Sequence, residues 1–158
     1  MSNINKKLLK IALVYRQRYL NCKAQEFIPA PKISFFASHE EVQNILRMAV
    51  DAKLFLSDEK YGLCSIKEIQ KFLDVDSTNK QHYRHILYDC DDFSYRLIGA
   101  LSVPGWSALA VGIAWSDVHA FNLFIDDRKQ LYIIEPQEDK IIPFSQSSWV
   151  YKPRVIMI

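Results

Sequence analysis

The chain has 158 residues, the size of one domain, and its 49% hydrophobic and 24% charged residues are typical of a globular protein. This composition excludes a mainly disordered chain, a collagen-like chain and a coiled coil. The net charge of +2 is unevenly placed, because residues 1–32 hold seven Lys or Arg and a single acid, Glu26. We interpret this segment as a helix with a basic solvated face. The alternative is that this basic segment binds an acidic partner, and binding of nucleic acid is not expected.

The sequence predicts neither a membrane span nor a secretory leader. No run of about 18 uncharged apolar residues occurs. The apolar stretch at residues 8–15 is followed by arginines instead of the small residues of a cleavage site. The cysteines Cys22, Cys64 and Cys90 are odd in number, widely spaced and form no CxxC pair, so neither a disulfide framework nor a zinc site is expected. We therefore expect a reduced, cytoplasmic protein.

The first half of the chain predicts helices. Apolar residues recur at steps of three and four over residues 4–21, which is the period of an amphipathic helix. Ser38 with Glu41, and Ser65 with Glu68, have the spacing of a capping box. Helices are therefore expected to follow each serine, with the polar stretch after the third helix forming a loop.

The second half predicts a helix near Cys90 followed by strands. Runs rich in Val, Ile, Leu, Phe and Tyr are bounded by polar turns, as is typical of strands. Helices followed by strands favour an α+β fold, with N-terminal helices and an active-site helix packed on a small antiparallel sheet. We expect a single domain, 1–158, with a helical part at 1–80 and a catalytic core at 81–158. The apolar runs are 107–115, 118–126, 130–135, 141–144 and 154–158.

Cys90 has the setting of a nucleophile. Asp89 is a good N-cap, so Cys90 falls in the first turn of a helix, where the positive end of the helix dipole favours thiolate. Asp91 and Asp92 oppose a further negative charge, so the thiolate needs a cationic partner.

His119 is the predicted partner, with Glu135 as the acid that orients it. If Asp126 faces Gln130 across a three-residue hairpin loop, the pleat puts His119 and Glu135 on one face as diagonal neighbours. In this arrangement Glu135 stabilises the cationic imidazole, His119 takes the proton of Cys90, and the thiolate attacks an acyl carbon. A loop of two residues would turn Glu135 away. Two polar side chains near His119 are expected to orient the ring or donate to an oxyanion: Asn122 and Gln137.

Three segments carry a resemblance to a known family. They are Tyr88-Asp89-Cys90-Asp91-Asp92-Phe93, Val118-His119-Ala120-Phe121-Asn122 and Tyr132-Ile133-Ile134-Glu135-Pro136-Gln137. Together they resemble the papain-like and transglutaminase-like cysteine peptidase superfamily. The closest likeness is to its short bacterial and phage-type members and to the protease domain of a fairy-ring mushroom lectin. The resemblance spans about a third of the chain and implies a catalytic triad of Cys90, His119 and Glu135.

The resemblance also has departures and further implications. The oxyanion glutamine that papain-type enzymes carry a few residues before the cysteine is missing, the nearest being Gln81. No metal or other cofactor is expected, although the lectin-linked proteases imply calcium at Asp91 and Asp92 as an alternative. Trp106, which follows the Pro104-Gly105 turn, is either core or the roof of a substrate groove.

The predicted function is that of a thiol protease or acyl transferase acting on a peptide or isopeptide amide. A peptidoglycan amidase, with cell-wall peptide as substrate, is the first alternative, since its active helix also opens with Asp-Cys. A non-catalytic binding module with a basic N-terminal helix is the second. The sequence leaves the substrate, the choice between hydrolysis and transamidation, and the oligomeric state open.

Overall fold

The computed structural model describes residues 28–158. The predicted helix at residues 4–21 and Cys22 lie outside this range. The described part contains more strand than α-helix, in an order that mixes the two along the chain. The elements are β1 (Ile33–Ser38), α2 (His39–Ala49), β2 (Lys53–Phe55), β3 (Lys60–Cys64), α3 (Ile66–Leu73), η1 (Thr78–Lys80), α4 (Cys90–Leu101), β4 (Val111–Trp115), β5 (Ala120–Ile125), β6 (Leu131–Glu135), β7 (Lys140–Pro143), η2 (Phe144–Gln146), η3 (Trp149–Tyr151) and β8 (Val155–Met157).

A six-stranded sheet forms the centre of the fold. Its strand order is β2-β8-β4-β5-β6-β7, and all neighbours are antiparallel except β2 and β8, which run parallel. The strands β1 and β3 form a separate antiparallel pair. Every residue of β5 and β6 is buried, because both faces of the sheet centre are covered. These two strands therefore read as continuous apolar runs instead of alternating ones.

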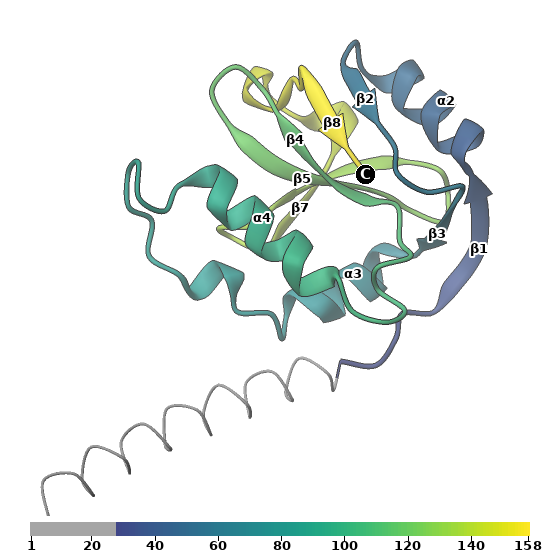
Figure 1. The fold of residues 1–158 in the computed structure, drawn as a ribbon, viewed down its shortest axis with the longest axis horizontal. Helices are drawn as coiled ribbons and strands as arrows, with labels where there is room; N and C mark the ends of the chain where they lie inside the picture. Colours follow the sequence, from purple (N-terminus) through teal and green to yellow (C-terminus); the bar gives the residue numbers. More distant parts are fainter. Residues whose placement is uncertain (1–27) are drawn as a thin grey trace, which may run out of the picture.

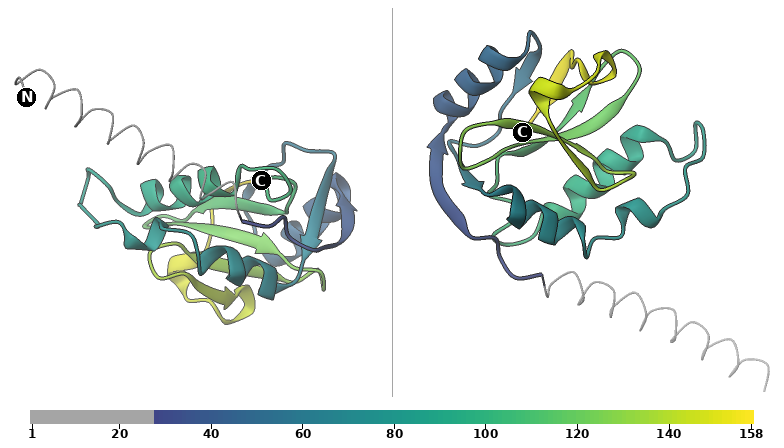
Figure 2. Two further views of the ribbon diagram at one scale, coloured as in Figure 1. Left: turned by 90° about the horizontal axis from the view of Figure 1, so that it is seen from below. Right: turned by 180° about the vertical axis from the view of Figure 1, so that it is seen from behind.

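Two apolar clusters pack on the central sheet. One joins α2 and the β1–β3 pair to Phe121, Leu123 and Ile133, and the other joins α3 and α4 to Phe124 and Ile134. Since alternate residues of a strand point to opposite faces, the odd-numbered and even-numbered positions of β5 contribute to different clusters. Figures 1 and 2 show α4 on one side of the sheet and the η2–η3 segment on the other.

The two predicted capping boxes have different outcomes. Ser38 caps α2, since its hydroxyl accepts from the Glu41 backbone N–H at 3.2 Å and the Glu41 carboxylate accepts from the Ser38 backbone N–H at 2.9 Å. Ser65 precedes α3 but its side chain makes no capping hydrogen bond. Glu68 accepts instead from the Lys71 ammonium at 2.6 Å. Both helices nevertheless begin where the pattern predicts.

The strands of the second half lie where the apolar runs predicted them, but the prediction for the first half is wrong. Residues 33–64 contain β1, β2 and β3 as well as α2, so this half is not a helical unit. These strands are three to six residues long, and β3 contains Gly62 at a point where it approaches Ala108. Such short segments have no clear period, and their pairing depends on residues far along the chain. The fold is β-rich, which corrects the predicted α+β class with N-terminal helices and a small antiparallel sheet.

Candidate functional site

Cys90 is the first residue of α4, with Asp89 as the N-cap. The Asp89 backbone N–H donates to the carboxylate of Asp92 at 3.0 Å, which fixes the start of the helix. The half-buried Cys90 Sγ accepts from the Ala120 backbone N–H at 3.4 Å. The thiol therefore lies between the positive end of a helix and an amide donor, and both stabilise negative charge on sulfur.

Acidic side chains flank the thiol. The contact between the Asp89 and Asp91 carboxyls lowers the pKa of Asp89 and raises the pKa of Asp91. Ligand atoms of Asp89, Cys90 and Asp91 lie within 4.8 Å of one another. In residues 28–158, this is the group of three acid or thiol side chains close enough together to hold a metal ion. The calcium alternative at Asp91 and Asp92 stays a prediction.

His119 and Glu135 meet as the hairpin register predicts. Asn122 pairs with Ile134 and Ile125 with Leu131, so β5 and β6 have the expected alignment. The loop closes with Lys129 at φ 61°, the left-handed residue of a three-residue hairpin. His119 Nε2 lies 2.7 Å from Glu135 Oε2, with both side chains largely buried. The register is confirmed.

Cys90 contacts the backbone directly beside His119. Ala120, whose amide binds the Cys90 sulfur, directly follows His119. The Ser116 hydroxyl fixes the backbone here, accepting from the His119 N–H at 3.0 Å. Because Glu135 holds Nε2, Nδ1 is the ring nitrogen that Glu135 leaves free. Within the described residues the sulfur's hydrogen bond is to the amide, not to the ring.

A cluster of donors holds the Glu135 carboxylate. Besides His119, the Tyr151 hydroxyl donates to Oε2 at 3.1 Å, and the Gln137 side-chain amide lies 3.5 Å from Oε1. Gln137 therefore contacts the acid and not the imidazole. The Tyr151 ring packs edge-on against both His119 and Phe121. Burial, followed by the charge of Glu135, raises the pKa of Tyr151 to about 12, so the hydroxyl stays a donor at neutral pH.

Tyr151 is the residue that the sequence analysis missed. It belongs to η3, sixteen positions beyond Glu135, and no motif marks it. Its position beside the acid follows from the path of the η2–η3 segment across the sheet (Figure 2). The one indication in the sequence is an aromatic residue within a polar stretch. This does not identify the residue that Tyr151 contacts.

Two predicted site residues have structural positions instead. Asn122 is fully buried on the face opposite His119, and its Nδ2 donates to the carbonyls of Ser94 and Gly112, each at 3.2 Å. It joins α4 to the sheet and cannot orient the imidazole, because the pleat turns it away. Trp106 is 2% exposed, and its indole N–H donates to the Pro29 carbonyl at 3.0 Å. The predicted groove role of Trp106 is wrong, because it belongs to the core.

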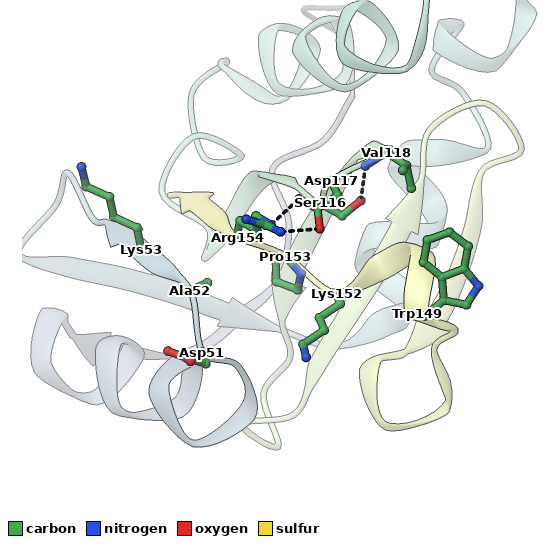
Figure 3. Close-up of a pocket in the computed structure, with 10 residues that line it drawn as sticks. All are labelled: Asp51, Ala52, Lys53, Ser116, Asp117, Val118, Trp149, Lys152, Pro153 and Arg154. Carbon is green, nitrogen blue, oxygen red and sulfur yellow. Dashed lines mark hydrogen bonds and ion pairs between the residues drawn. The ribbon is translucent and has the colours of Figure 1, made fainter.

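An open cavity of about 540 Å³ adjoins the turn that leads into His119 (Figure 3). The Trp149 side chain stands at its edge with 73% of its surface exposed. Arg154 pairs with Asp117 at one side of the cavity, and Lys152 lies on the segment just before Arg154. The lining residues are Asp51, Ala52, Lys53, Ser116, Asp117, Val118, Trp149, Lys152, Pro153 and Arg154.

Comparison with known proteins relates this architecture to a lectin fold. No family model and no curated protein matches the chain. A solved structure described as a PSL1a–E64 complex, PSL1a being a Polyporus squamosus lectin, has a TM-score of 0.69 and 22% identity over 78% of this chain. A structure of Polyporus squamosus lectin bound to the human-type influenza-binding epitope Neu5Acα2-6Galβ1-4GlcNAc has a TM-score of 0.64 and 23% identity over 78% of this chain. The chain spans 51% and 49% of these two chains.

These findings contradict several predictions made from the sequence. The neighbours are lectins, which are binding proteins, so the comparisons contradict assignment to the papain-like and transglutaminase-like peptidases. They likewise contradict the predicted hydrolase or thiol protease activity and the predicted peptide or cell-wall substrate. In residues 28–158, none of the helices has the length and apolar character needed to cross a membrane.

Proposed function

We propose that Cys90, together with His119 and Glu135, forms a nucleophilic thiol centre that captures an electrophilic ligand covalently. The observation that carries this proposal is a thiol at a helix N-terminus that binds the amide of Ala120, the residue directly after His119, whose imidazole a buried carboxylate holds at 2.7 Å. A helix terminus and an amide donor stabilise a thiolate, and an oriented imidazole accepts the proton that the thiol loses. The proposal concerns capture of a ligand and includes no hydrolytic turnover.

The chemistry is simplest for an epoxide. His119 Nδ1 takes the thiol proton, the Cys90 sulfur attacks a ring carbon, a C–S bond forms and a C–O bond of the ring breaks. The released alkoxide then takes the proton from the imidazolium, so charge and atoms balance. Support comes from the neighbour described as a complex with E64, which is an epoxysuccinyl compound.

The test is site-resolved labelling of the native chain with E64 and, separately, with iodoacetamide. Cys64 is a matched control within the chain, because it is 2% exposed and burial raises its pKa to about 12. We expect the adduct mass on the Cys90 peptide of the native protein, and on the Cys64 peptide only after denaturation. His119→Ala is expected to slow labelling of Cys90 at least tenfold. Equal labelling of Cys64 and Cys90 in the native protein, or an unchanged rate in His119→Ala, contradicts the proposal.

Carbohydrate binding is a second proposed function, and the cavity in Figure 3 supports it. The exposed Trp149 ring offers a flat face to the apolar side of a sugar, and Lys152 offers a cation to an acidic sugar's carboxylate. One neighbour was solved with a glycan that contains such an acidic sugar, Neu5Ac.

The glycan test is independent of the thiol. We expect Neu5Acα2-6Galβ1-4GlcNAc to bind in a calorimetric titration and Galβ1-4GlcNAc, which lacks the carboxylate, to bind at least tenfold more weakly. Trp149→Ala and Lys152→Ala should each weaken binding, whereas Cys90→Ala should leave it unchanged. Equal binding of the two glycans, or no heat with either, contradicts this second function and leaves the thiol centre untouched.

A further inference from the structure

One face of the strands β4, β8 and β2 carries two rows of side chains. Residues that pair across neighbouring strands point to the same side of a sheet, so the rows follow from the register. This is the face on which α4 lies, because the Tyr95 ring of α4 is 6.0 Å from the Trp115 ring. The rows are Ile113, Met157 and Phe55, and beside them Trp115, Val155 and Lys53.

The cover that α4 gives to this face decreases from β4 to β2. The helix packs on β4 and β5 (Figure 1), and Ile113 is 2% exposed. Further along the same row, Met157 is 46% and Phe55 48% exposed. On α4, Tyr95 is 51% exposed, and a Cβ added four residues later, at Gly99, would meet nothing within 4 Å. Tyr95, Met157 and Phe55 therefore border an apolar strip that is half exposed in residues 28–158.

The described chain starts near one end of this apolar strip. The Trp106 indole donates to the Pro29 carbonyl at 3.0 Å. Two tight turns then lead from Trp106 into β4, because the Leu109 N–H donates to the Trp106 carbonyl at 3.1 Å and the Val111 N–H donates to the Leu109 carbonyl at 2.8 Å. Val111 opens β4 two residues before Ile113, so residues 1–27 join the chain near the row that contains Ile113.

The segment that joins there has the length and pattern to cover the apolar strip. Residues 4–21 are predicted to form an amphipathic helix, which would be about 27 Å long. The connector at residues 22–27 spans up to about 20 Å when it is extended. The apolar stripe that this helix presents is Ile4, Leu8, Ile11, Tyr15 and Tyr19.

Charge complementarity gives the direction in which the segment runs. The Cys90 sulfur contacts the amide of Ala120, and Ala120 pairs with Trp115, so α4 begins at the end of the strip away from Ile113. A helix running back along α4 from the row of Ile113 brings its N-terminal half to the acidic first turn of α4. Opposite charges then face each other, which fixes the register of the contact. The cations are Lys6, Lys7 and Lys10, and the acids are Asp91 and Asp92.

We propose that residues 4–21 dock as an amphipathic helix on the apolar strip of the same chain. Their apolar stripe lies against Tyr95, Met157 and Phe55, so that both surfaces leave water together. The docked segment places a second helix beside α4 and extends the helical layer over β8 and β2. The contact is independent of the chemistry proposed for Cys90.

The test is photo-cross-linking in the full chain. In the variant Tyr15→p-benzoylphenylalanine the probe lies on the apolar stripe, and cross-links mapped by mass spectrometry should fall within residues 53–57, 95–99 and 155–158. The yield should not change with protein concentration, because the contact is within one chain. Gln17→p-benzoylphenylalanine is the control on the segment, since two residues turn a helix by about 200° and direct that probe away from the strip.

Substitutions on the apolar strip control for location. Met157→Gln should lower the cross-linking yield about threefold, because it removes apolar burial from the contact. Phe55→Gln should do the same, and it keeps the test available if Met157→Gln does not fold. Met48→Gln makes the same change at an exposed methionine of α2 and should keep the parent's yield.

Four results would overturn the proposal. They are cross-links that join two chains, cross-links that fall on other parts of the chain, an equal yield from the Gln17 probe, and full yield after both Met157→Gln and Phe55→Gln. Labelling of Cys90 is a separate readout, so failure here leaves the thiol centre to its own test.

Discussion

Glu135→Gln tests how the thiol centre is activated. The carboxylate accepts from His119, Tyr151 and Gln137, whereas an amide in its place has one accepting oxygen and an NH₂ group that must face a donor. A hydrogen bond to a charged group is worth about 1.5–3 kcal/mol and a neutral one about 0.5–1.5 kcal/mol. Glu135→Gln should therefore stabilise the imidazolium of His119 by about 1–1.5 kcal/mol less than Glu135 does. This loss corresponds to about a tenfold slower reaction of Cys90.

The assay is the pseudo-first-order rate of iodoacetamide labelling at Cys90, read by peptide mass spectrometry with Cys64 as the internal reference. Glu138→Gln is the matched control, since it makes the same change at an exposed neighbouring position and should not alter the rate. Tyr151→Phe removes one donor to Glu135 but keeps the ring, so its effect should be smaller. A Glu135→Gln rate within twofold of the parent, in protein with native circular dichroism, would refute activation of the thiol through Glu135.

Three further predictions concern stability. Gly112→Ala places a Cβ against the backbone oxygen of Met157, so the urea midpoint should fall by an amount equivalent to about 1–3 kcal/mol or more. Asn122→Leu leaves the Ser94 and Gly112 carbonyls without their donor and should cost about 1–3 kcal/mol, measured in the same way; an unchanged midpoint would mean that these bonds contribute nothing. Burial and neighbouring carboxylates raise the pKa of Asp139 to about 6, so the folded chain holds this proton more tightly than the unfolded one. Stability should therefore fall as the pH rises from about 4 to about 6, and Asp139→Asn should reduce that fall; identical pH profiles for the two proteins would contradict the raised pKa of Asp139.

The sequence alone determined the parts of the site that depend on local rules. A strand alternates faces with a period of two, and a three-residue loop fixes how two strands align, so the contact between His119 and Glu135 could be worked out from loop length. The start of α4 at Cys90 follows in the same way from the aspartate before it. Each of these features needs only residues that are close in the chain, or joined by one short turn.

The tertiary structure decided what depends on contacts between distant segments. Tyr151 reaches Glu135 because η3 crosses the sheet, and Trp106 is buried because it packs against Phe72 in the core. The strands β1, β2 and β3 exist through pairing with partners elsewhere in the chain, β2 with the C-terminal β8. A short strand has little preference of its own, and its hydrogen bonds and burial come from a neighbour that local patterns do not identify. For this reason the hairpin could be derived from the sequence, whereas the β-rich fold around it could not.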